Sequence, residues 1–156
     1  MLSNEAQELS ELLIANGLTI SVAESCTGGS FSQAITSIPG ASSYFDCGYI
    51  TYSNQSKVDM LGVEVQTIKT YGAVSEEVAL EMVIGVSNKS HSDVALSITG
   101  VAGPTGGTTE KPVGTVCFGF FLDGKTSTTT KLFSGDRANI VSQSVSYALK
   151  QLSCRF

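Results

Sequence analysis

Ser25 is the residue in this chain best placed to act as a nucleophile. It lies within residues 21–30 (SVAESCTGGS), where an alternation of apolar and polar residues gives way to two glycines and then to helical periodicity. This order predicts a serine at the turn between a strand and a helix N-terminus, where unpaired backbone N–H groups can stabilise a developing oxyanion. The alternative role for a serine at such a turn is an N-cap.

A serine nucleophile needs a base, and histidine is an unpromising one here. The chain has a single histidine, His91, which stands between two serines and fits a surface or capping role. Lys57 is the other candidate, one helical turn after Ser53 in a segment that leaves one strand and enters a helix. A lysine made partly neutral by burial near a serine can act as a general base, and Tyr52 is placed to relay a proton or hydrogen-bond the amine. The alternative is a solvated lysine beside a packed tyrosine.

Cys26 is the rival nucleophile, because a thiol near a helix N-terminus can have a lowered pKa. Its only candidate partner would be His91. The other cysteines, Cys47, Cys117 and Cys154, are widely spaced and form no C-x-x-C pair, which argues against a zinc site. We expect Cys47 and Cys117 to be reduced thiols in the core, in keeping with a cytoplasmic protein.

A glycine-rich loop spans residues 100–112 and follows a predicted strand. It would therefore lie at a carboxyl edge of the sheet, where α/β proteins bind ligands, and such loops often cradle anionic groups. The loop matches neither a Walker A sequence nor the G-x-G-x-x-G fingerprint. The alternative is a long connection without a ligand, although long loops without secondary structure are usually functional.

Hydrophobic periodicity and turn signals predict an alternation of helices and strands followed by a hairpin. Predicted helices cover residues 4–16, 27–38 and 53–61, with two more beginning at Ser75 and Asp136; predicted strands cover 18–23, 47–52, 94–99, 113–122 and 126–133, the last two joined at Asp123-Gly124. This order predicts one domain over residues 1–156, an α/β fold that forms a three-layer α/β/α sandwich on a mixed β-sheet.

Charge and hydropathy exclude several classes of partner. The formal net charge of -5 argues against nucleic acid, which requires clustered lysine and arginine. No apolar run approaches the length of a membrane span, and the N-terminus lacks the basic and apolar regions of a signal peptide. We therefore expect a cytoplasmic protein that binds a small molecule. It is a possible homo-oligomer, and among oligomeric states we expect a dimer first.

Taken together, the motifs resemble the CinA C-terminal domain family. They are AESCTGG at 23–29, TYSN-x-x-K at 51–57, YGAVSE at 71–76, ITG-x-AGP-x-GG at 98–107, EKPVGTV at 110–116 and GDR at 135–137. Each motif is weak alone, but together they cover nearly the whole chain. The resemblance implies an amidase that hydrolyses nicotinamide mononucleotide to nicotinate mononucleotide and ammonia, so that a by-product of NAD consumption returns to NAD synthesis.

The resemblance also implies roles for particular residues. A serine nucleophile, a lysine base and a nearby tyrosine fall on Ser25, Lys57 and Tyr52, and no metal or organic cofactor is required. The expected substrate-binding residues lie around the first turn, the start of the 53–61 helix, the glycine-rich loop and the last helix: they are Thr27, Gly28, Gly29, Asn54, Thr99, Gly100, Gly103, Gly106, Gly107 and Arg137.

Two alternatives stay open at this point. One is a non-catalytic protein that binds the nucleotide on the same fold. The other is an esterase or amidase with a different substrate, or a thiol enzyme that uses Cys26 in place of Ser25.

Overall fold

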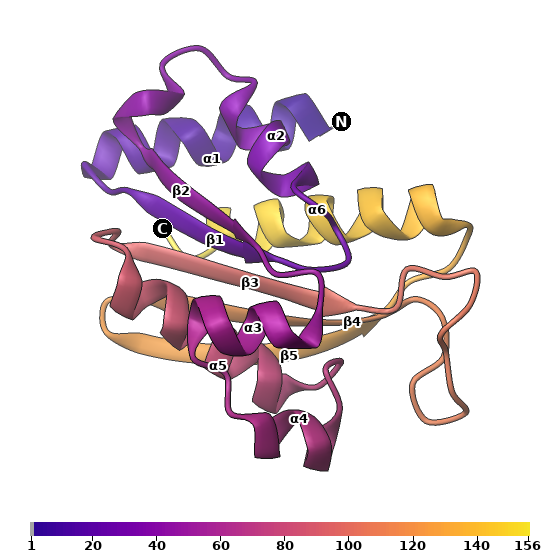
Figure 1. The fold of residues 1–156 in the computed structure, drawn as a ribbon. Helices are drawn as coiled ribbons and strands as arrows, with labels where there is room; N and C mark the ends of the chain where they lie inside the picture. The colour runs from indigo at the N-terminus through magenta and orange to yellow at the C-terminus, as the bar shows by residue number, and fades with distance from the viewer. Residues whose placement is uncertain (1) are drawn as a thin grey trace.

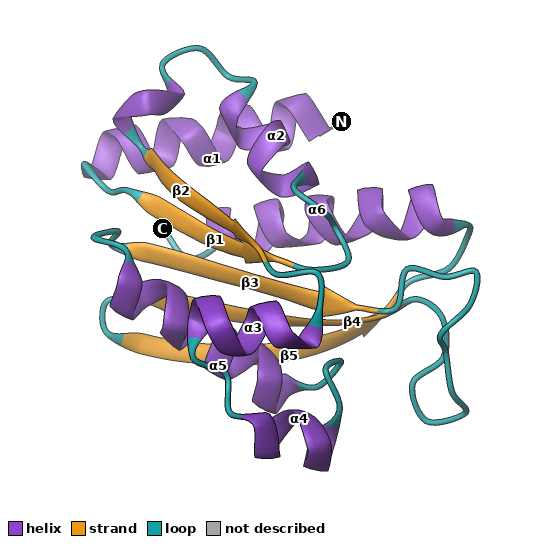
Figure 2. Cartoon of the chain, viewed as in Figure 1, coloured by secondary structure: helices purple, strands orange, loops and turns teal. Residues whose placement is uncertain are grey.

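The computed structural model describes residues 2–156, which form a five-stranded mixed sheet covered by helices on both faces (Figures 1 and 2). The elements in chain order are α1 (Leu2–Asn16), β1 (Ile20–Glu24), α2 (Ser30–Thr36), the 3-10 turn η1 (Ala41–Ser43), β2 (Phe45–Ile50), α3 (Asn54–Leu61), α4 (Val65–Tyr71), α5 (Glu76–Lys89), β3 (Val94–Gly100), β4 (Thr115–Leu122), β5 (Lys125–Leu132) and α6 (Arg137–Ser153). The predicted three-layer α/β/α sandwich on a mixed sheet is confirmed.

The strand order is β2-β1-β3-β4-β5. The strands β2, β1 and β3 are parallel, whereas β4 and β5 form an antiparallel hairpin on one side of them. The hairpin turns at Asp123-Gly124, as predicted, and both residues have positive φ, which a tight two-residue turn favours. Because β1 lies between two parallel neighbours, its carboxyl end is flanked by theirs.

Two hydrophobic layers hold the sheet between its helices. On one face α1, α2 and α6 pack around Leu9, Phe31 and Leu149, which are fully buried. On the other face α5 packs Met82 and Val83 against the sheet, and α3 joins it through Leu61. Figure 1 shows these two groups of helices on opposite sides of the strands. The apolar positions thus follow the predicted helical stripes.

Several element boundaries differ from the sequence-based expectation by one to three residues. The helix predicted over 27–38 begins only at Ser30, because Gly28 and Gly29 adopt positive φ and keep the preceding residues in a turn. The strand predicted over 47–52 runs from Phe45 to Ile50. Helix α4 was not predicted, and it buries no side chain that would give an apolar stripe.

The loops that carry the predicted motifs gather at one end of the molecule. The segments after β1, β2, β3 and β5 all lie at the carboxyl edge of the parallel strands, at the right of Figure 2, where α3 and α6 begin. The sheet therefore brings segments that are far apart in sequence to one place.

Candidate active site

Two consecutive residues at the end of β1 point to opposite faces of the sheet. Side chains alternate along a strand, and the ladder continues to Ser25, whose N–H donates to the carbonyl of Ile98 at 2.9 Å. The Glu24 carboxylate contacts α2, whereas the Ser25 hydroxyl contacts Lys57 of α3. The alternation thus gives Glu24 a structural role and its neighbour Ser25 a chemical role.

Lys57 and Ser25 form a buried pair. The Nζ atom of Lys57 lies 3.0 Å from Ser25 Oγ and donates to the carbonyl of Thr51 at 2.7 Å. The Lys57 residue is 1% exposed and Ser25 is 7% exposed. Ser53 caps α3 through the N–H of Ser56, which fixes the first turn of the helix that carries the lysine. The predicted pairing of these two side chains is therefore present in the geometry.

The surroundings of Lys57 favour its neutral form. Burial lowers the pKa of Lys57 from 10.5 to about 8, partly opposed by the thiol of Cys26. A neutral amine has two hydrogens and one lone pair, so it can donate to the Thr51 carbonyl while it accepts the hydroxyl proton of Ser25. This arrangement suits a general base for a serine nucleophile.

Glu24 is a structural residue of the site that the sequence analysis did not identify. Its buried carboxylate accepts hydrogen bonds from the N–H groups of Phe31 (2.7 Å) and Ser32 (3.1 Å) and from the hydroxyls of Thr27 and Ser32, both at 2.8 Å. Glu24 therefore satisfies backbone N–H donors at the N-terminus of α2. Because it stands at the end of β1, its carboxylate also anchors both sides of the turn that holds Ser25. The available sequence signal was an acidic residue directly after the predicted strand 18–23, four residues before Gly28.

The turn leaves several backbone donors beside Ser25. The N–H of Gly28 donates to the carbonyl of Ser25 at 3.0 Å, so it is engaged within the turn. Among residues 2–156, the N–H groups of Cys26, Thr27 and Gly29 have no hydrogen-bond acceptor. Donors of this kind next to a nucleophile can stabilise an oxyanion. The unpaired N–H groups expected at this turn are thus those of Cys26, Thr27 and Gly29.

Arg137 connects three segments at the carboxyl edge. Its Nη2 donates to the hydroxyl of Tyr52 at 2.6 Å, and its Nη1 donates to the carbonyl of Gly103 at 2.7 Å. Asp136 caps α6 directly before it, as predicted. Within residues 2–156 the hydroxyl of Tyr52 has Arg137 as its hydrogen-bond partner, so a proton relay from Tyr52 to Lys57 stays a prediction.

Two expectations about cysteines are wrong. Burial raises the pKa of the Cys26 thiol to about 12, so the helix N-terminus does not favour a thiolate there. Cys47 is only half-buried, and its sulfur contacts the hydroxyl of Ser21 and the carboxylate of Asp46, because β2 is an edge strand with one polar side. Cys117 is buried at 2% exposure, as predicted.

The glycine-rich loop owes several of its glycines to packing. A Cβ atom on Gly103 would lie 2.4 Å from Val113, and one on Gly107 would lie 2.6 Å from the Val113 backbone. A Cβ atom on Gly100 would lie 2.8 Å from the side chain of Val116. By contrast, a Cβ on Gly106 would meet nothing closer than 3.8 Å. The loop is therefore folded onto itself, and Gly106 is explained by its φ of +90°, which residues with a side chain rarely adopt. None of these glycines requires a ligand to account for it.

The remaining expected binding residues divide by exposure. Thr27 and Thr99 are buried and donate their hydroxyls to Glu24 and to the carbonyl of Ala73. Asn54 is exposed at the start of α3. Gly28 faces open space, so the outer side of the first turn is free to approach a ligand.

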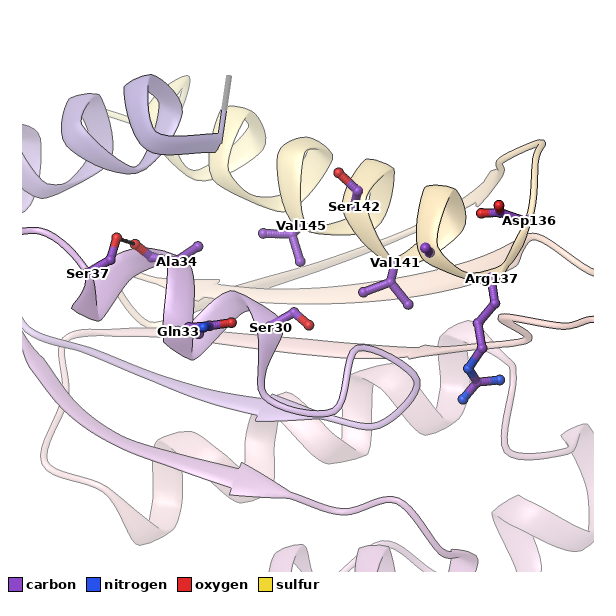
Figure 3. A pocket seen from close by; sticks show the side chains of 10 residues that line it. Ser30, Gln33, Ala34, Ser37, Asp136, Arg137, Val141, Ser142 and Val145 are labelled. Carbon is purple, nitrogen blue, oxygen red and sulfur yellow. Dashed lines mark hydrogen bonds between the residues drawn. The ribbon is translucent and has the colours of Figure 1, made fainter.

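A groove of about 860 Å³ lies between α2 and α6. Val141 and Val145 line it from α6, and Gln33 lines it from α2 (Figure 3). Neither Ser25 nor Lys57 lines this groove, whereas Arg137 stands at its end and extends beyond it. This groove is thus adjacent to the candidate site without containing it.

Two further findings bear on the class of protein. Within residues 2–156, no three or more His, Cys, Asp or Glu side chains gather closely enough to hold a metal ion. Across the same residues, every helix is too short or too polar to cross a membrane.

Comparison with known proteins identifies the same family as the sequence motifs. The model of the CinA C-terminal domain matches residues 2–156. The chain is 46% identical to nicotinamide-nucleotide amidohydrolase PncC of Escherichia coli K12, over 100% of this chain and 98% of that protein. It is 49% identical to the protein of the same name from Enterobacter agglomerans, over 92% of this chain and 88% of that protein.

Solved structures give the same result. A CinA superfamily protein from Klebsiella pneumoniae superposes with a TM-score of 0.96 at 33% identity, over 99% of this chain and 97% of that one. The competence/damage inducible protein CihA from Agrobacterium tumefaciens superposes with a TM-score of 0.94 at 38% identity, over 98% and 94% of the two chains. The match of the family model and the identity over whole chains show that this chain belongs to the CinA C-terminal domain family.

Proposed function

We propose that this protein hydrolyses the carboxamide of nicotinamide mononucleotide to nicotinate mononucleotide and ammonia. The observation that carries the proposal is the contact of a buried lysine amine with a serine hydroxyl at 3.0 Å. The name of the Escherichia coli relative, a nicotinamide-nucleotide amidohydrolase that aligns with the whole of this chain, supports the choice of substrate.

In the proposed mechanism, Ser25 Oγ attacks the carboxamide carbon while neutral Lys57 takes the hydroxyl proton. The negative charge that develops on the carbonyl oxygen is stabilised by free N–H groups of the 25–29 turn, with Cys26 and Thr27 as the donors. Lys57 then protonates the leaving nitrogen, ammonia departs, and an acyl-enzyme ester on Ser25 remains. Water, deprotonated by the same amine, hydrolyses that ester and restores the serine.

The position of Tyr52 suits the cationic ring of this substrate. Tyr52 directly follows Thr51, whose carbonyl holds Lys57, and its side chain is 59% exposed. Its hydroxyl is held by Arg137, which fixes the ring. A fixed and accessible tyrosine face can attract a pyridinium cation. We therefore assign Tyr52 to substrate binding in this proposal, and keep proton relay as a second role to be tested.

The test is ammonia release from nicotinamide mononucleotide in the presence of a chelator. We expect release by the native protein, and loss of release in Ser25→Ala and in Lys57→Met. The matched controls are Ser127→Ala and Lys125→Met, which change exposed residues of the β4–β5 hairpin. Retained turnover by Ser25→Ala, with loss in Cys26→Ala, would instead indicate a thiol enzyme.

A measurement of nucleotide binding distinguishes the amidase from the remaining alternative, a non-catalytic binding protein. A native protein that binds nicotinamide mononucleotide but releases no ammonia would be a non-catalytic nucleotide-binding member of the family. In that case Ser25→Ala should bind the nucleotide as tightly as the native protein does.

A further inference from the structure

The side-chain hydroxyl of Thr51 is a buried polar group that the proposed mechanism does not use. Thr51 is 0% exposed, and its Oγ1 atom has no hydrogen-bond partner within residues 2–156. The other buried side-chain oxygens without a partner in this part of the chain belong to Glu5 of α1 and Ser153 of α6. Of these residues, Thr51 is the one that contacts Lys57, through its carbonyl. A buried hydroxyl without a partner destabilises a fold, so its presence beside the candidate base needs an explanation.

The sheet places Thr51 directly beside Ser25. The parallel strands β1 and β2 pair Glu24 with Ile50, and the N–H of Thr51 donates to the carbonyl of Glu24 at 2.9 Å. The ladder therefore continues by one residue, which sets Thr51 next to Ser25. Because side chains alternate along a strand, the Thr51 side chain lies on the same face of the sheet as Ser25. This is the face on which the Lys57 amine meets the serine.

The Lys57 amine has one hydrogen that no oxygen accepts. Its Nζ atom has two partners within residues 2–156, Ser25 Oγ at 3.0 Å and the carbonyl of Thr51 at 2.7 Å. A neutral amine that accepts the serine proton donates one of its two hydrogens to the carbonyl, and the other stays free. The ammonium that forms when the proton moves from Oγ to Nζ keeps the same free hydrogen. A charged donor would then be left unsatisfied in a buried site.

Thr51 has the acceptor that this hydrogen lacks. Its hydroxyl and its carbonyl belong to one residue, so an amine held at 2.7 Å from the carbonyl oxygen is within reach of a rotation of the threonine side chain. A hydroxyl has two lone pairs, and here neither has a donor. A hydrogen bond from an ammonium is stronger than one from a neutral amine. The hydroxyl can therefore favour the state in which Lys57 holds the proton of Ser25.

We propose that Thr51 is a positioning residue for the base: its hydroxyl rotates to accept a hydrogen bond from Lys57 as the amine becomes charged. The inference rests on the proposed function, in which Lys57 takes the proton of Ser25 while Oγ bonds to the carboxamide carbon. An interaction made mainly in the charged state lowers the barrier to forming that state, whereas one made equally before and after does not. The hydroxyl without a partner in the resting protein is thus an acceptor held for turnover.

The titratable groups around this amine do not obscure its own titration. The thiol of Cys26 contributes to the pKa of Lys57, but burial raises the pKa of that thiol to about 12, so it stays neutral between pH 7 and 10.5. The carboxylate of Glu24 lies on the other face of the sheet, bound to α2. The Tyr52 hydroxyl accepts from Arg137, which stays charged throughout. Helix α5 packs against α3 through an apolar cluster.

The experiment compares native protein with Thr51→Val, which keeps the shape of the side chain without the hydroxyl, and with Thr51→Ser, which keeps the hydroxyl. For nicotinamide mononucleotide we expect kcat to fall about 10- to 100-fold in Thr51→Val with KM nearly unchanged, the range for losing a hydrogen bond to a charged group. Thr51→Ser should stay within about threefold of native, because the acceptor is retained. Thr129→Val is the matched control, since it makes the same change at a half-buried threonine of β5.

The pH profile separates this role from a loss of packing. Without the hydroxyl the ammonium is less favoured, so the pKa of Lys57 should be lower in Thr51→Val than in native protein. The rise of kcat/KM with pH should then move to lower pH and end at a lower plateau. A lower plateau with the rise at its native position would overturn the proposal. Equal losses in Thr51→Ser and Thr51→Val, or no loss in Thr51→Val, would overturn it as well.

The pKa of Lys57 can also be followed without turnover. An NMR titration of ¹³C-labelled lysine side chains reports it, with the Lys57 signal assigned by its absence in Lys57→Met. A lower pKa in Thr51→Val than in native protein supports the proposal, and an equal or higher pKa overturns it. If the native protein releases no ammonia, the amidase proposal fails, and this titration alone decides whether the hydroxyl stabilises the charged amine. If Thr51→Val does not fold, Thr51→Ala and Thr51→Ser give the same comparison.

Discussion

Replacing Lys57 by methionine should change the pH dependence of stability as well as remove activity. The pKa of this amine is lowered from 10.5 to about 8 in the folded protein, a difference of about 2.5. At 1.36 kcal/mol for each pKa unit, the penalty for keeping the charged amine in the fold is about 3 kcal/mol.

The sign of the effect follows from proton binding. Below pH 8 the amine is protonated in the folded and unfolded chains, so the folded protein carries the full penalty. Between pH 8 and 10.5 the unfolded chain keeps its proton while the folded protein loses it, and the free energy of unfolding rises with pH. Above 10.5 both chains are neutral and the penalty is absent. The methionine variant lacks this contribution throughout.

The assay is urea denaturation of native protein and Lys57→Met at several pH values from 7 to 10.5, the last being the ordinary pKa of lysine. Other titrating groups are common to both proteins, so they cancel in the difference between the two free energies of unfolding. We expect the native protein to gain about 3 kcal/mol over the variant across this range. Lys125→Met, which removes an exposed lysine, gives the baseline.

Kinetics of the native protein test the same pKa. The value of kcat/KM for nicotinamide mononucleotide should rise about tenfold for each pH unit below 8 and level off above it. A stability difference that stays constant with pH, together with a flat rate profile between about pH 7 and 9, would refute the assignment of Lys57 as a buried and largely neutral base.

Three further outcomes test the surroundings of the pair. Glu24→Gln should lower the free energy of unfolding by about 2 to 4 kcal/mol in urea denaturation, because each carboxylate oxygen accepts from two donors and the NH₂ group that replaces one oxygen cannot accept from them. Thr51→Val should leave stability unchanged or raise it by about 1 kcal/mol, because its buried hydroxyl has no partner within residues 2–156. A thiol reagent should modify exposed Cys154 well before Cys26, as peptide mass spectrometry would show; faster labelling of Cys26 would contradict its raised pKa.

The pairing of Ser25 with Lys57 was accessible from sequence because each follows a strand. The motifs at 23–29 and 51–57 come after β1 and β2, and these strands turned out to be parallel neighbours. Parallel neighbours end at the same edge, so the two side chains had to meet if the strands were adjacent. The order of helices and strands along the chain likewise sufficed to predict the three-layer α/β/α architecture.

Other features needed the three-dimensional contacts. The role of Glu24 depends on α2 beginning at Ser30, which the pattern placed three residues earlier. The sequence could not show which glycines of the 100–112 loop are required by packing, because contacts with Val113 exist only in the folded structure. Helix α4 buries no residue and so leaves no hydrophobic period to detect. The contact between Tyr52 and Arg137 joins residues 85 positions apart.

The carboxylate of Glu24 has a consequence for chemical labelling. Because the protein's own acid holds the turn, the serine and its amine are aligned before any ligand arrives. A fluorophosphonate or sulfonyl fluoride probe should therefore tag Ser25 in the ligand-free protein, in competition with nicotinamide mononucleotide. Such a tag would report, in a crude extract, how much of this protein is folded and free of substrate.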